Sequence, residues 1–89
     1  MANLITEISA TGYRGKFVAE GFTGTFAANS AKVLTTISGA RDGLGSFDAY
    51  KEEGDQFSYN LHPVSLDKAG ELATLAGTVV DAVGAELQE

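Results

Sequence analysis

The residues best suited to chemistry or binding lie in one acidic stretch of the second half of the chain. A tyrosine lies among four carboxylates there, and the set is Asp48, Tyr50, Glu52, Glu53 and Asp55. A calcium loop needs alternating oxygen ligands, a turn glycine and a terminal bidentate acid, and this stretch lacks that spacing. We interpret it as a solvated hairpin tip and as the candidate surface for a protein partner, and we expect no metal site.

His62 is the only histidine and the other candidate for chemistry. A catalytic histidine needs a group that orients it and a nucleophile or substrate within hydrogen-bond reach. The chain has no cysteine, no G-x-S-x-G motif and no second histidine. We therefore expect a structural or surface role for His62, no catalysis and no cofactor.

Two features could hold an anion, but both lack the expected context. The glycine-rich residues 39–45 contain one arginine, yet they lead into a strand, whereas a phosphate-binding loop leads into a helix N-terminus. We interpret them as a connecting loop. Arg14 and Lys16 share a predicted face with Thr23 and Thr25, without the aromatic platform of single-strand nucleic-acid binders. With a net charge of −6, the chain should bind neither nucleic acid nor a membrane.

The first element that would position these residues is a strand, predicted from the alternating side chains of Leu4–Ser9. A hairpin follows it. A two-residue turn at Glu20-Gly21 pairs Ala19 with Phe22. The same register sets Phe17 opposite Gly24 and Phe26 opposite Gly15. A ring over a cross-strand glycine covers bare backbone and helps to fix the pairing.

The next segments are compatible with more than one secondary structure or register. Residues 26–38 fit either a strand or a partly helical segment, and the β-branched run 33–37 favours a strand. Residues 46–61 predict a second hairpin with a three-residue loop, Glu52-Glu53-Gly54, in which Lys51 faces Asp55. That register groups Phe47, Ala49, Phe57, Tyr59 and Leu61 on one face, with Asp48, Tyr50 and Asn60 on the other.

From Ser65 the hydrophobic period changes to 3.6 residues and predicts a helix that runs to about Glu89, with Ser65 as its N-cap. Its apolar side includes Leu66, Leu72, Leu75, Val79, Val80 and Val83. Three glycines recur every seven residues beside an alanine, as Gly70, Ala73, Gly77 and Gly84. They allow either close packing of the helix on its own sheet or a groove for a second helix in a symmetric homodimer.

Length and composition place these elements in one domain, residues 1–89. The fold class we predict is α+β: four to six short antiparallel strands in two hairpins, with one long C-terminal amphipathic helix on one face. The core should join Phe17, Phe22, Phe26, Phe47, Phe57 and Tyr59 to Leu72, Leu75, Val79, Val80 and Val83. The absence of cysteine and of an apolar run of about 18 residues predicts a soluble cytoplasmic protein.

The function predicted from these features is that of a small acidic, non-catalytic protein-binding module. It would act as an adaptor or inhibitor on a partner with a basic surface and could form a homodimer. One alternative is a structural subunit of a larger assembly, such as a phage-particle component. Another is a small enzyme that uses His62 in a site between protomers. The sequence does not identify the partner or the strand order.

Overall fold

The computed structural model describes residues 3–11, 13–51 and 55–89, and its elements confirm the α+β class. Within these ranges, six strands, a short 3-10 helix and one α-helix follow each other along the chain. They are β1 (Ile5–Ile8), β2 (Arg14–Ala19), β3 (Phe22–Ala28), β4 (Leu34–Arg41), β5 (Gly45–Tyr50), β6 (Ser58–Pro63), η1 (Leu66–Lys68) and α1 (Ala69–Leu87).

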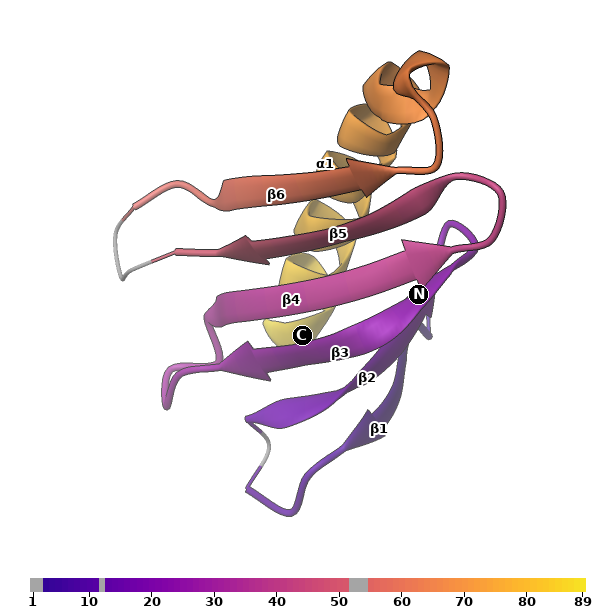
Figure 1. Ribbon diagram of the computed structural model, residues 1–89. Helices are drawn as coiled ribbons and strands as arrows, with labels where there is room; N and C mark the ends of the chain where they lie inside the picture. The colour runs from indigo at the N-terminus through magenta and orange to yellow at the C-terminus, as the bar shows by residue number, and fades with distance from the viewer. Residues whose placement is uncertain (1–2, 12, 52–54) are drawn as a thin grey trace.

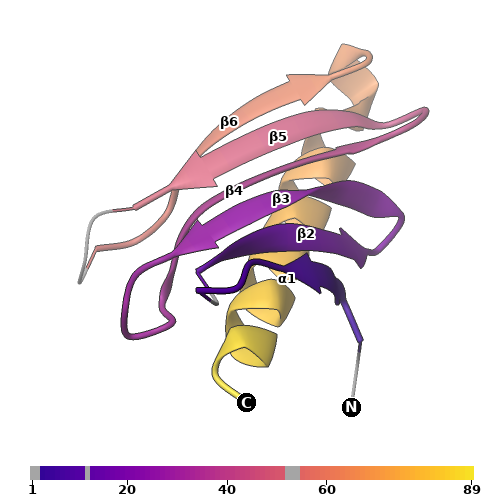
Figure 2. The same cartoon turned by 90° about the horizontal axis from the view of Figure 1, so that it is seen from below.

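All six strands form one antiparallel sheet whose spatial order is the order of the sequence. Figure 1 shows the strands stacked from β6 to β1 in front of α1, and Figure 2 shows the helix along the same single side. We call the side packed against α1 the inner face and the other side the outer face. None of the described elements covers the outer face. No helix among the described residues is long and apolar enough to cross a membrane.

The first hairpin has the predicted register. Ala19 pairs with Phe22, Phe17 with Gly24, and Gly15 with Phe26. Both turn residues have positive φ, 52° at Glu20 and 80° at Gly21, as a type I′ turn requires. Because this turn follows the natural twist of two strands, a short sequence signal sets the whole pairing.

The predicted register of the second hairpin is wrong by two residues. Phe47 pairs with Leu61 and Ala49 with Tyr59, so Lys51 does not face Asp55 in the β5–β6 ladder. A shift of two residues keeps every side chain on its face, and the predicted division into inner and outer residues therefore holds. The proposed turn itself, residues 52–54, lies outside the described residues.

The secondary structure just before and just after β4 also differs from the predictions for residues 26–38 and 39–45. The segment before it is a turn rather than a helix: the Asn29 side chain accepts hydrogen bonds from the backbone N–H groups of Ala31 and Val33, and Lys32 has a φ of 62°. The predicted 39–45 loop is mostly strand, since β4 continues to Arg41 and β5 begins at Gly45. Only residues 42–44 connect them.

The helix begins later than predicted. Ser65 does not cap it; its hydroxyl donates to the Asp67 carboxylate, which lowers the pKa of Asp67, and the first turn is the 3-10 helix η1. Leu66 is consequently not part of the buried stripe and is 92% exposed. From Leu72 onward the apolar side of α1 faces the sheet as the periodicity predicts.

The core lies between α1 and the inner face. Four phenylalanines, Phe17, Phe22, Phe26 and Phe47, are buried against Leu72, Val79, Val80 and Val83. The predicted members Phe57 and Leu75 are only partly buried, and Tyr59 is 38% exposed. Gly39 lies at the centre, where an added Cβ would be 3.0 Å from the Phe17 ring and 3.2 Å from the Phe47 ring, so a larger residue there would require these rings to shift.

One carboxylate joins the two ends of the chain. Glu86, near the end of α1, accepts hydrogen bonds from the backbone N–H groups of Leu4 at 3.0 Å and Ile5 at 2.7 Å. Leu4 and Ile5 precede Glu86 by more than 80 positions in the chain, and these bonds hold them at the start of the edge strand β1. The register of β1 shifts between Ile5 and Glu7, which breaks the predicted alternation and leaves Ile8 exposed.

Candidate functional site: the outer face of the sheet

The strand register arranges the outer face in three rows that run across the sheet. The first row is Arg14, Ala27, Thr36, Tyr50 and Ser58; the second is Glu7, Lys16, Thr25, Ser38, Asp48 and Asn60; the third is Val18, Thr23, Ala40, Ser46 and His62. The central strands β3 and β4 therefore present only threonine, serine and alanine. Larger and charged side chains lie on either side of this central strip.

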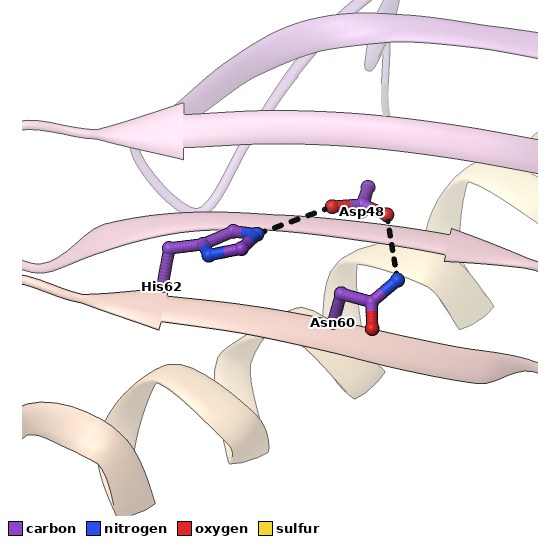
Figure 3. Close-up of polar contacts among 3 residues, drawn as sticks. All are labelled: Asp48, Asn60 and His62. Carbon is purple, nitrogen blue, oxygen red and sulfur yellow. Dashed lines mark hydrogen bonds and ion pairs between the residues drawn. The ribbon is translucent and has the colours of Figure 1, made fainter.

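One side of the strip carries a polar cluster formed by Asp48, Asn60 and His62. Asn60 Nδ2 donates to Asp48 Oδ2 at 3.0 Å, and His62 Nε2 lies 3.4 Å from Asp48 Oδ1. Figure 3 shows Asp48 on β5 between the two β6 side chains, with the helix behind the strands. The His62 and Asp48 side chains are 63% and 44% exposed, so the cluster is open to solvent.

Tyr50 lies on the same face as this cluster, one row away from Asp48, and is 54% exposed. An exposed tyrosine supplies a large contact area together with a polar tip, as binding surfaces commonly do. Of the other predicted binding residues, Asp55 is exposed beyond the end of β5. Glu52 and Glu53 lie outside the described residues.

The polar cluster also bears on the enzyme hypothesis. Ser46 is the direct cross-strand neighbour of His62, so serine, histidine and aspartate occur together on the outer face. In a serine nucleophile the histidine contacts the hydroxyl with one ring nitrogen and the carboxylate with the other. Here the Asp48 contact is made by Nε2, and no hydrogen bond joins Ser46 to His62 among the described residues. The absence of catalysis remains a prediction.

The other side of the strip carries two cations. Lys16 Nζ is 3.7 Å from Glu7 Oε2, and both side chains are mostly exposed, so the pair contributes little to stability. The backbone N–H of Arg14 donates to Ser9 Oγ, whereas its guanidinium makes no ion pair or hydrogen bond with the described residues. Both cations border a hollow of about 500 Å³ that extends over Thr25, Ala27 and Thr36.

The small-residue side of α1 is open rather than closely packed. A Cβ added at Gly70 or Gly77 would meet nothing within 4 Å, and Ala73 is exposed. Gly84 alone lies against the sheet, where an added Cβ would be 3.9 Å from Leu34. Close packing on the sheet therefore explains only Gly84, and the helix-contact surface formed by the four small residues remains a prediction.

Acidic charge gathers on the helix. Residues 69–89 contain four acids and no lysine or arginine, and one of these acids is Asp81. Burial, and secondarily the charge of Asp81, raises the pKa of Tyr59 above its ordinary value. Among the described residues, no group of three or more histidine, aspartate or glutamate side chains is placed to hold a metal ion.

Comparisons of the chain with protein-family models, with curated proteins and with solved structures found no match.

Sequence reasoning missed one member of the outer face and one alignment across it. His62 was expected at the junction between strand and helix, although its alternation with Asn60 was a signal that it belongs beside Asp48. The rows that place Lys16 and Asp48 on one line across the sheet could not be found from the sequence, because they require the strand order.

Proposed function

We propose that the protein is a non-catalytic protein-binding module that acts through the outer face of its sheet, as an adaptor or an inhibitor. The observation that carries the proposal is the exposed Tyr50 beside the polar cluster, on a sheet face that none of the described elements covers. Tyrosine provides contact area at a low cost in conformational entropy, and a solvent-accessible aspartate provides a charged contact.

The chemistry of the polar cluster specifies the partner's contact group. Asp48 has one weak contact, to His62, and one amide donor, Asn60, so it can accept a further hydrogen bond from a cation. A lysine or arginine of the partner fits this position. The interaction should weaken with added salt, because screening acts over about 8–10 Å at physiological ionic strength.

The test compares immobilised variants in a cell extract to which untagged copies of the chain are added. We expect wild-type protein to retain a protein that salt releases, and Tyr50→Ser and Asp48→Asn to lose it. Glu71→Gln is the matched control, because it removes one exposed acid from the helix and leaves the outer face unchanged. Equal retention by Asp48→Asn, Tyr50→Ser and wild type would contradict the proposal.

A structural subunit of a larger assembly is the second candidate. It is favoured by the open sheet, in which β1 and β6 are the outermost strands and each pairs with one neighbour only among the described residues. Edge strands can pair with another chain and extend a sheet. Light scattering that shows growth beyond a dimer as concentration rises would support this candidate, whereas a fixed small mass would oppose it.

A further inference from the structure

We propose that the partner bound by the outer face is a second copy of the chain, packed face to face about a two-fold axis parallel to the strands. This inference rests on the proposed function, since it names the partner of the same surface. Three independent features carry it: the pairing of charges, the small side chains of the central strip, and the fit of Tyr50 to the hollow beside Arg14.

The axis follows from the positions of the charges. A two-fold axis along the strands and between β3 and β4 sets β2 over β5 of the second copy and keeps each row in place. Lys16 then faces Asp48 of the second copy, because both belong to the second row. An axis across the strands would instead set Lys16 over Lys16 and Asp48 over Asp48. Opposite charges therefore select one of the two arrangements.

The same operation brings aromatic and cationic groups together in the first row. Arg14 faces Tyr50 of the second copy, and a guanidinium over a tyrosine ring is a favourable pair. The hollow of about 500 Å³ bordered by Arg14 and Lys16 lies at this place, so the exposed Tyr50 ring of one copy enters the hollow of the other. Glu7 in turn faces Asn60 of the second copy across the second row.

The centre of the face permits this approach. Packed sheets lie about 10 Å apart, which requires side chains that interdigitate without charge. The strip on β3 and β4 has only threonine, serine and alanine, and the operation sets Thr25 over Ser38 of the second copy and Ala27 over Thr36. Large residues are confined to the flanks, where Arg14 meets Tyr50 and Lys16 meets Asp48 of the second copy.

The size of the face predicts a weak dimer. Six strands about 4.8 Å apart and three rows of side chains cover about 500 Å² on each copy. The total of about 1,000 Å² is at the low end for specific interfaces, so association should be reversible and dependent on concentration. Because charge pairs at the flanks contribute to it, association should also fall with ionic strength.

The test is sedimentation equilibrium of the purified chain from about 10 μM to 1 mM at low and high salt. We expect salt-sensitive dimerisation that Lys16→Asp or Asp48→Lys weakens at least tenfold, because each substitution acts at two symmetric contacts. The double variant, which exchanges the two charges, should restore the wild-type dimer to within about threefold. Lys68→Asp and Glu71→Lys are the matched controls, with the same changes in net charge away from the outer face.

Three results would overturn the dimer. They are a wild-type chain that stays monomeric up to about 1 mM, equal effects of the variants and their controls, or a double variant no better than the single ones. Circular dichroism of each variant confirms folding. If the chain is monomeric but wild type retains another protein that Asp48→Asn loses, the dimer fails and the proposed function stands. If neither the self-association nor the retention of another protein depends on Asp48 or Tyr50, the dimer and the proposed function both fail.

Discussion

The most direct test of the fold is a charge placed in the core at Val79, whose exposure is 0%. In Val79→Asp, keeping the carboxyl neutral at pH 7 costs about 4 kcal/mol, because its ordinary pKa is about 3.9 and each pH unit corresponds to 1.36 kcal/mol. Losing the apolar side chain costs about 1.5–2 kcal/mol, and burying an unpaired neutral carboxyl about 1–3 kcal/mol. A domain of this size is stable by about 5–10 kcal/mol, so most of the variant should be unfolded.

The pH dependence separates the charge from the packing. Burial raises the folded-state pKa of the new carboxyl, so the folded form is relatively favoured below pH 4 and loses stability as pH rises through the raised value. Val79→Asn has a similar shape and does not titrate. In urea titrations at pH 7 and pH 4, the Asp variant should be about 4 kcal/mol less stable than the Asn variant at pH 7 and nearly equal to it at pH 4.

Thr78→Asp is the positional control, since Thr78 lies on the exposed side of the same helix. It should change stability by less than about 0.5 kcal/mol. A Val79→Asp protein that melts cooperatively at pH 7 near the wild-type temperature would refute the packing of α1 on the sheet.

Three further substitutions test other parts of the structure. Gly77→Ala should stabilise the protein by about 1 kcal/mol in thermal melts, because the added methyl meets nothing and alanine favours the helix; a loss of stability would mean that this side of α1 is packed. Glu86→Ala should cost about 2 kcal/mol and speed hydrogen exchange in β1, because two N–H groups lose their acceptor; unchanged exchange there would count against the contact. The pKa of Tyr59 is higher in the folded state than its value of 10 in the unfolded state. The stability that this difference contributes is fully present below pH 10 and is lost as pH rises through the folded-state pKa. Tyr59→Phe should therefore lose less stability than wild type between pH 9 and 11 in urea titrations, and Asp81→Asn should lower the Tyr59 pKa; identical losses in wild type and Tyr59→Phe would refute this.

Features set by neighbouring residues could be predicted from the sequence. The Glu20-Gly21 turn was predictable because a two-residue turn sets the pairing of its two flanking strands from neighbouring residues alone. The helix stripe from Leu72 to Val83 was predictable for the same reason, since a period of 3.6 residues directly reports the buried side.

Features that depend on distant residues could not be predicted from the sequence. Alternation assigned Asp48 and Tyr50 to the outer face, but it does not distinguish registers two residues apart, and the β5–β6 pairing was therefore misplaced. Leu66 fits the hydrophobic stripe and yet lies in a 3-10 turn that leaves it exposed. The alignment of Lys16 with Asp48 depends on three intervening strand pairings, none of which is a local property.

The neighbour-to-neighbour order of the strands has a consequence for folding kinetics. Every pairing in the sheet joins consecutive strands, so the sheet can form hairpin by hairpin with short loop closures, each within microseconds. The contacts of Glu86 with Leu4 and Ile5 span more than 80 residues and can form only when helix and sheet are both in place. Interactions that form after the transition state affect the unfolding rate alone. The link between the two chain ends should therefore slow unfolding and leave the folding rate unchanged.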